Sequence, residues 1–144
     1  MTLHTELNVT REKHDKEWGY EDWLVNSEEK NLCGKRLILH RQTHCSLHYH
    51  KIKTELFYVN KGLVLMEFDG RKGVMKPGDT LLITTEKRHR FTGITDAEII
   101  EFSTFHRDSD SHREQPSGKW TDEEFKKMLD EHKAEIEKFH AFGK

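Results

Sequence analysis

Hydrophobic and polar residues alternate over short stretches in the middle of this chain, and turn residues separate the stretches. Such alternation is typical of strands that place one face on a core. Asp69-Gly70 is a strong two-residue hairpin signal between two of them. The expected strands are Arg36–His40, Ser46–His50, Glu55–Asn60, Leu63–Phe68, Gly73–Met75, Leu81–Ile83, His89–Phe91 and Ala97–Phe105. Regular short strands predict an all-β fold, a closed or nearly closed jelly-roll barrel with a ligand cavity at one mouth.

A helical pattern follows the strands. Thr121 and Glu124 form a capping box, and Trp120 can pack on Phe125 across it, so a helix is expected to begin at about Asp122. Lysine and glutamate fill one face of this amphipathic helix, and the other face is apolar, with Phe125, Met128, Leu129, Ile136 and Phe139. The apolar face must be buried, either on the barrel or on a second subunit.

The 144 residues fit one domain, 1–144, with an N-terminal arm at 1–30, a barrel at 31–107 and a C-terminal helix at 121–140. The arm is polar and carries Trp18 and Trp23, which could cover one mouth of the barrel or reach a partner subunit, although simple packing within the chain is the favoured interpretation. The two tryptophans and the one-sided helix offer more apolar surface than one small barrel covers. A two-fold homodimer is therefore expected.

Charge and composition exclude several classes of partner. The formal net charge is -2 and the pI is about 6.6, so the chain has no basic field for nucleic acid. Cys33 and Cys45 are too few for a disulfide framework, and no segment looks like a signal peptide, which predicts a cytoplasmic protein. No run of eighteen apolar residues is present, so no membrane span is expected. The expected partner is a small molecule.

The most specific chemical feature is His48-x-His50, followed by Glu55 and then Gly62. Residues two apart in a strand point to the same face with Cα atoms about 6.6 Å apart, so the two imidazoles can converge on one ion. Glu55 begins the next aromatic and β-branched run, which closes at the glycine. The spacing predicts that these three side chains bind one metal ion.

A fourth ligand is expected after a second turn. Lys76-Pro77-Gly78-Asp79 places proline and glycine at the centre of a type II turn, a short buried strand follows, and His89 begins the next strand. Three neutral imidazoles and a carboxylate suit one divalent transition metal, Mn, Fe, Co, Ni or Zn, and ligand type alone does not choose among these. The other histidines are expected at the surface and not as ligands: His4, His14, His40, His44, His106, His112, His132 and His140.

These two segments, CSLHYHKIKTELFYVNKG and GRKGVMKPGDTLLITTEKRH, resemble the two motifs of the cupin superfamily. The resemblance covers roughly residues 32–105 and implies a metal held by His48, His50, Glu55 and His89. One position departs from the family pattern, because Gln42 stands where the first motif usually opens with glycine. That position shapes a turn and binds no metal.

The flanking segments are similar to cupins of the mannose-6-phosphate isomerase type. Glu17-Trp18-Gly19 near the start and HRFTGITDAEIIEFSTFHRDSDSHR near the end carry this likeness. On that pattern Lys53 matches a basic residue two before the glutamate, Glu101 a last-strand carboxylate, and Arg113 an arginine. Asp108 and Asp110 match the acidic cluster that precedes this arginine. Alternation along the strand leaves open which of Glu98 and Glu101 faces inward.

The resemblance implies aldose–ketose isomerisation of a sugar or sugar phosphate through an enediolate that the metal stabilises. Glu101 or Lys53 would move a proton between C2 and C1, and Arg113 would neutralise charge or hold a phosphate. Two other classes stay open, because a fold does not decide a function. One is a metal-dependent dioxygenase, and the other is a cupin that binds a sugar or a metal without turnover.

Overall fold

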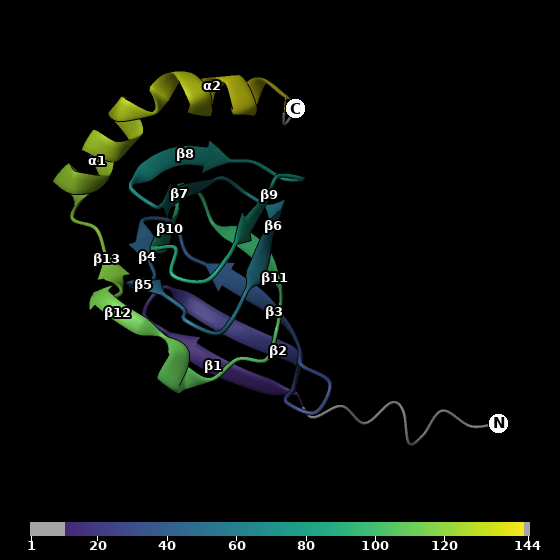
Figure 1. Ribbon diagram of the computed structural model, residues 1–144. Coiled ribbons are helices and arrows are strands. Elements are labelled where there is room, and N and C mark those ends of the chain that lie inside the picture. The colour runs from purple at the N-terminus through teal and green to yellow at the C-terminus, as the bar shows by residue number, and fades with distance from the viewer. Residues whose placement is uncertain (1–10, 143–144) are drawn as a thin grey trace.

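A computed structural model describes residues 11–142 of the chain, and its strands form two sheets (Figure 1). The first sheet has six strands in the order β1-β2-β3-β11-β6-β9. Its strands are β1 (Glu12–Lys16), β2 (Gly19–Ser27), β3 (Leu32–Leu39), β6 (Glu55–Lys61), β9 (Thr80–Ile83) and β11 (Ala97–Ser103). All of the pairings between them are antiparallel.

The second sheet has seven strands, and β10 lies at its centre. It contains β4 (Thr43–His44), β5 (Leu47–Tyr49), β7 (Val64–Phe68), β8 (Arg71–Met75), β10 (His89–Gly93), β12 (His112–Gln115) and β13 (Gly118–Lys119). Strand β10 pairs with β7 on one side and with β4 and β5 on the other. A short 3-10 helix, η1 (Asp108–Asp110), precedes β12.

The main core lies between the two sheets. Leu37, Val59 and Ile99 of the six-stranded sheet pack in one cluster with Met66 and Phe91 of the seven-stranded sheet. The chain is thus mostly β with a jelly-roll arrangement, but the expectation of a closed barrel is corrected, because β8 and β9 remain free edges of separate sheets.

Both predicted turns form between strands. Asp69 and Gly70 have φ values of 49° and 81°, the left-handed conformation that a tight hairpin requires, and they join β7 to β8. At the second turn Gly78 has a φ of 95°, and the Asp79 N–H donates to the Lys76 carbonyl at 3.0 Å. These are the features of a type II turn.

The prediction of an N-terminal arm is largely wrong, because most of its described residues form strands. Residues 1–10 lie outside the described residues, but β1 and β2 are strands of the six-stranded sheet and not an irregular arm. Their high polarity hid this, because the outward side chains are charged. Trp18 is only 4% exposed and packs edge to face on Phe91 at 5.0 Å between ring centroids. Trp23 is also buried within the chain.

The C-terminal helix begins as predicted, at the capping box formed by Thr121 and Glu124. It is corrected in one respect: α1 (Asp122–Glu131) and α2 (Lys133–Phe142) are separate helices that meet at His132. The bend lets α2 follow β8, where the Val74 N–H donates to Glu135 at 3.0 Å. Among the described residues, no helix is both long and apolar enough to cross a membrane.

The apolar side of the two helices is covered by the chain's own strands. Met128, Leu129, Ile136 and Phe139 pack against a second cluster formed by Leu63, Leu65, Val74 and Ile94. The sequence left open whether this face packs on the barrel or on a second subunit, and it packs on the chain's own sheet. Figure 1 shows the helices running along the outside of β7 and β8.

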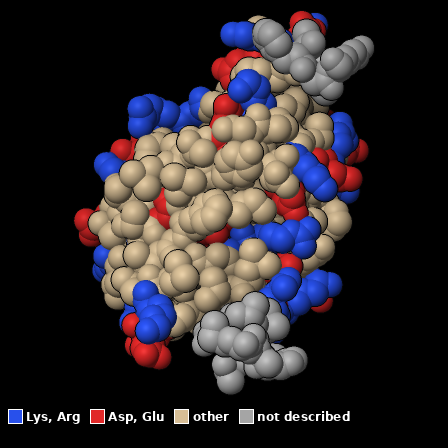
Figure 2. Space-filling model, turned by 90° about the vertical axis from the view of Figure 1, so that its right-hand side faces the viewer, with Lys and Arg blue, Asp and Glu red and all other residues tan. Residues whose placement is uncertain are grey.

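Exposed apolar surface lies elsewhere, on the outer face of the six-stranded sheet. Phe102, Leu56 and Leu82 are neighbours in one row across β11, β6 and β9, and Phe102 and Leu82 are 58% and 56% exposed. Figure 2 shows the side of the molecule on which β6 and β11 lie, and uncharged residues cover most of it. The homodimer stays a prediction. The exposed apolar residues that would favour it lie on this face, because Trp18 and Trp23 are buried.

Candidate metal centre and pocket

The predicted metal ligands come from both sheets and meet at one point. His48 and His50 lie on and directly after β5, His89 begins β10 opposite His48, and Glu55 begins β6 on the facing sheet. One ligand atom from each side chain lies within 4.8 Å of the others. Atoms bound to one ion at 2.0–2.2 Å cannot be much more than 4 Å apart. The four ligand atoms therefore need to move only slightly closer together to bind one ion.

Backbone carbonyls fix the orientation of all three imidazoles. The Nδ1–H groups donate to carbonyl oxygens, His48 to Ser46 at 2.8 Å, His50 to Asp110 at 3.0 Å and His89 to Lys87 at 2.8 Å. A proton on Nδ1 leaves a lone pair on Nε2, which is the ligand form of a neutral imidazole. The three Nε2 atoms are thus prepared to bind a cation.

The carboxylate of Glu55 faces these lone pairs without a proton between them. Glu55 Oε1 lies 2.9 Å from His89 Nε2 and 3.5 Å from His50 Nε2. Both Glu55 Oε1 and His89 Nε2 are buried and have no hydrogen-bond partner among the described residues. Acceptors that face one another in a buried site are costly unless a cation lies between them. The cluster fits a divalent metal.

The protonation states of the ligands agree with this. Burial and the neighbouring His89 and His50 lower the pKa of His48 to about 3, so this ring is neutral over a wide pH range. Burial alone would raise the pKa of Glu55, but the charge of Lys53 and the contacts with His50 and His89 together hold this pKa well below its usual range. Glu55 is therefore an anionic ligand.

Two residues of the first motif adopt a left-handed backbone conformation in the turns on either side of it. Gly62 has a φ of 78°, and a Cβ there would meet the Asp96 carbonyl, so only glycine fits. Gln42 occupies a similar left-handed conformation, with a φ of 73°, although a side chain there is unfavourable. Its amide offsets that cost by donating to the Trp120 carbonyl at 2.9 Å and to Asp122 at 2.8 Å.

Two of the predicted catalytic residues lie together beside the metal cluster. Lys53 is 3% exposed, and its Nζ lies 3.0 Å from Glu55 Oε2 and 3.1 Å from Glu101 Oε2. Burial would lower the pKa of Lys53, but the charges of Glu101 and Glu55 raise it above its usual range. Lys53 is therefore held as a cation between two carboxylates, which favours Glu101 as the group that accepts a proton.

Pairing with β3 decides the orientation of β11. Glu101 is 3% exposed on the inner face, where it also accepts a hydrogen bond from the Ser103 hydroxyl at 2.8 Å. Glu98 faces outward, and Arg36 and Asn60 donate to its two carboxylate oxygens. Of the two glutamates, Glu101 is the one that reaches the pocket.

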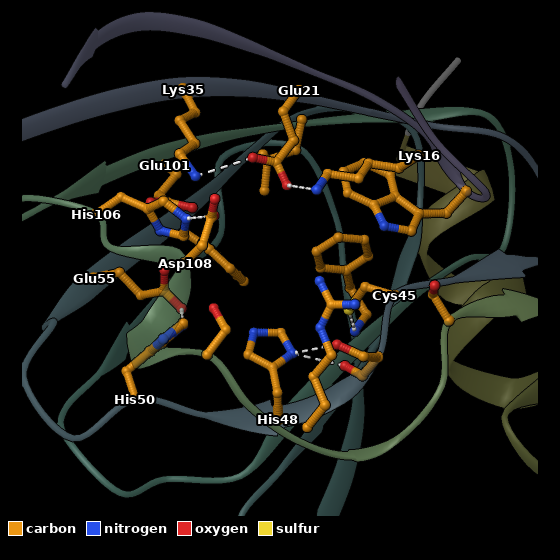
Figure 3. A pocket seen from close by; sticks show the side chains of 18 of the residues that line it. Lys16, Glu21, Lys35, Cys45, His48, His50, Glu55, Glu101, His106 and Asp108 are labelled. Carbon is orange, nitrogen blue, oxygen red and sulfur yellow. Dashed lines mark hydrogen bonds and ion pairs between the residues drawn. The ribbon is translucent and has the colours of Figure 1, made fainter. Parts of the chain in front are cut away.

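A cavity of about 250 Å³ opens in front of the metal cluster (Figure 3). His48 lies on one side of it, Glu21 and Lys16 lie opposite, and His106 and Asp108 lie beside Glu101. Arg113 lines it from β12, where it is exposed and in register with His48. Trp18, Leu37, Phe57 and Phe91 add apolar lining. The cavity combines an apolar wall with many charged groups.

Two histidines that were expected at the surface lie inside the protein. His44 is 7% exposed and stacks on Trp120 at 4.1 Å between ring centroids. His106 lines the pocket, where its Nδ1 accepts from Lys53 at 3.1 Å and its Nε2–H donates to Asp108 at 2.9 Å. His40 is exposed, whereas His14, His112 and His132 are half-buried, and His4 and the side chain of His140 lie outside the described part of the chain.

The pocket wall also contains a buried ion pair that the sequence did not predict. Lys35 Nζ lies 2.9 Å from Glu21 Oε1 and 4.3 Å from the centre of the Trp23 ring. Lys35 could have been found, because it alternates with Leu37 and Leu39 on the inner face of its strand. Glu21 had no such signal, since its strand was not predicted.

Asp110 connects the two parts of the site. Its carboxylate accepts hydrogen bonds from the N–H groups of Lys51, Ile52 and Lys53 at 2.9–3.2 Å, and its carbonyl accepts the bond from His50. Burial would raise the pKa of Asp110, but these backbone N–H groups lower it. One buried residue thus orients a metal ligand and the loop that carries Lys53.

We expect Asp110→Ala to weaken metal binding by about 10–100-fold, the usual effect of disturbing a group that orients a ligand, because the backbone carbonyl that accepts from His50 remains but loses the carboxylate contacts that hold residue 110 in place. Three N–H groups would lose their acceptor, of which that of Lys53 is buried, and this also lowers the free energy of unfolding by roughly 1–3 kcal/mol. Competition with a chelator measures the first effect and urea denaturation the second. Ser109→Ala in the same 3-10 helix is the control, and equal metal affinity in both variants would contradict the prediction.

Comparison with known proteins supports the cupin assignment. The model of the family described as "Cupin domain" matches residues 36–104. No curated protein matches the chain. Among solved structures, an RmlC-like cupin from Shewanella frigidimarina has a TM-score of 0.62 at 18% identity, over 69% of this chain and 88% of that one. The family model thus matches slightly less than half of the chain, and the RmlC-like cupin has a similar fold.

Two further solved structures have the same fold. KdgF from a Halomonas species has a TM-score of 0.59 at 18% identity, and the match covers 71% of this chain and 97% of KdgF. Pac13, a nucleoside dehydratase from Streptomyces, has a TM-score of 0.64 at 11% identity, and the match covers 75% of this chain and 90% of Pac13. At these identities the likeness shows the fold alone.

Proposed function

Because residues 36–104 match the cupin domain and its pocket holds a His-His-Glu-His cluster, we propose that this protein is a metal-dependent aldose–ketose isomerase. Its substrate is a sugar or a sugar phosphate. One observation carries the proposal: the buried carboxylate of Glu101 lies on the inner face of the pocket, linked through Lys53 to the ligand Glu55. A base beside a Lewis acid is what proton transfer next to a carbonyl needs.

His48, His50, Glu55 and His89 would hold the ion, which when bound supplies Lewis acidity toward a carbonyl and a neighbouring hydroxyl. Glu101 would take the proton from C2 of the open-chain aldose and return it to C1, and an enediolate forms between the two transfers. The hydroxyl proton of O2 passes to O1 in the same sequence, which leaves the carbonyl at C2. Lys53 keeps the carboxylate of Glu101 in place and offsets negative charge that develops nearby. Arg113, at the mouth of the pocket, contacts the part of the substrate farther from the metal.

The apolar lining has a role in the same reaction. Trp18, Phe57 and Phe91 border the cavity and leave water little room on that side. Exclusion of water strengthens the electrostatic contacts of Glu101 and Lys53 with the reacting atoms.

A two-step experiment tests the proposal. The protein is purified without chelator and its metal content is measured. Aldoses and aldose phosphates are then incubated with it in D₂O, and proton NMR follows exchange at C2. Exchange with one substrate, lost after metal removal and restored by Mn, Co, Ni or Zn, is the expected result. The D₂O readout detects proton transfer even where the ketose is scarce at equilibrium.

The other classes give different outcomes. Bound metal and no exchange with any aldose would contradict an isomerase. Oxygen uptake in the presence of an aromatic or thiol substrate would then point to a dioxygenase. Tight sugar binding without turnover would point to a binding protein.

A further inference from the structure

The lysines in the pocket are already engaged by carboxylates. Lys35 is 2% exposed and pairs with one oxygen of Glu21 at 2.9 Å, and Lys16 lies 3.9 Å from the other oxygen. Lys53 lies between Glu55 and Glu101, as described above. The charges of Lys35 and Lys53 are thus offset by carboxylates at hydrogen-bond distance, and Lys16 is paired more loosely.

Glu21, the partner of Lys35, stays ionised at neutral pH. Burial alone would raise the pKa of Glu21, but the charge and hydrogen bond of Lys35, with smaller effects of Trp23 and Lys16, lower it to about 2. The Trp23 indole N–H donates to the same carboxylate oxygen at 2.9 Å. This carboxylate neutralises Lys35 at every pH at which the protein would be assayed.

Arg113 is the remaining cation of the lining, and it has no carboxylate partner among residues 11–142. It is exposed at the mouth of the pocket. A phosphate dianion usually needs several donors or positive groups in a protein site, and one solvated guanidinium supplies little of this.

Acidic side chains outnumber basic ones in the pocket. Within the described part of the chain, six carboxylates and four cations line it, and a divalent ion would make the total neutral. The acidic residues of the lining are Asp15, Glu17, Glu21, Glu55, Glu101 and Asp108. The exposed groups of the lining are the carboxylates of Asp15, Glu17 and Asp108 and the guanidinium of Arg113, so an approaching anion meets a rim with a net negative charge.

Carboxylates accept hydrogen bonds, and sugar hydroxyls donate them. The cavity volume of about 250 Å³ is below the 300–1,000 Å³ typical of pockets for drug-sized ligands, which fits a small ligand. We propose that the pocket selects an uncharged polyhydroxy compound, a free aldose or ketose, over a sugar phosphate or a sugar acid. This inference rests on the proposed function, because it names the substrate class of the same site.

Calorimetric titration of the metal-loaded protein tests the inference. The probes are matched sets of D-aldohexoses, each as the free sugar, the 6-phosphate and the uronate. We expect a free sugar to bind at least about ten times more tightly than its two charged counterparts. Tighter binding of a phosphate or a uronate would overturn the inference, and so would the absence of binding by every free sugar.

The double variant Glu17→Gln with Asp108→Asn tests the cause. Removal of two negative charges at the mouth should reduce the preference for the free sugar roughly two- to five-fold at low salt, and less at high salt. The double variant Glu123→Gln with Asp130→Asn on α1 changes the net charge equally but lies outside the pocket lining, and is the control. An unchanged preference in the pocket variant would remove the electrostatic explanation and overturn the inference.

The two proposals fail in different ways. Exchange at C2 of an aldose phosphate, with weak binding of the free sugar, would keep the isomerase and overturn the substrate class. Selective binding of a free sugar without exchange at C2 would keep the substrate class and contradict the isomerase.

Discussion

His50→Ala should give a folded protein that binds divalent metal far more weakly and shows no isomerase turnover. His50 supplies one of four convergent ligand atoms, and its ring is held by the Asp110 carbonyl. With three ligands the ion is bound more weakly and is wrongly placed for the substrate. The loss of affinity should exceed the 10–100-fold that follows from changing groups that only orient ligands.

Thermal unfolding measures this without an activity assay. A ligand that binds only the folded state stabilises it by about 2.7 kcal/mol when its concentration is 100 times Kd. Added Mn, Ni or Zn should therefore raise the Tm of the wild type and not that of His50→Ala. His112→Ala is the matched control, because His112 stacks on Tyr49 in the neighbouring strand and is not one of the four ligands. An equal rise of Tm in His50→Ala and the wild type would contradict the four-ligand site.

Glu101→Gln should keep the metal and the fold but lower turnover by roughly 10²–10⁴-fold, the usual contribution of general acid–base catalysis. The amide keeps the shape of the side chain and can still accept a hydrogen bond from Lys53 through its oxygen. It cannot take a proton from carbon. The variant thus separates proton transfer from metal binding.

Metal content, Tm and exchange at C2 are measured on the same preparation. Glu98→Gln is the control on the same strand, since Glu98 faces outward and contacts Arg36 and Asn60. Glu98→Gln should retain wild-type exchange. Full exchange in Glu101→Gln would exclude Glu101 as the base and assign the proton transfer to Lys53.

The metal cluster could be predicted because most of its geometry is local. His48 and His50 are two residues apart, so an extended backbone alone places them on one face. The turns that bring Glu55 and His89 toward them depend on nearby residues, among them Gly62 and Pro77-Gly78. Even Gln42, which departs from the family pattern, adopts the left-handed turn that the motif requires.

The strands were predicted well where side chains alternate and poorly where both faces are polar. Strands β6, β7 and β11 lie within two residues of their expected bounds. Strands β1 and β2 were missed because their charged side chains gave no apolar face, and only pairing with β3 makes them strands. Closure of the barrel was wrong for a related reason: whether two edge strands meet depends on the twist and packing of whole sheets.

The sequence by itself determined the His-His-Glu-His cluster, the type of fold and the start of the C-terminal helix, because each depends largely on residues close together in the chain. Only the tertiary structure decided which charged groups lie inside. Lys53, in the loop before β6, meets Glu101 of β11, and Lys35 of β3 meets Glu21 of the paired strand β2, which the sequence pattern did not predict. A charge is stable in the interior only beside its partner, so its burial cannot be predicted until the strands that carry both partners are paired.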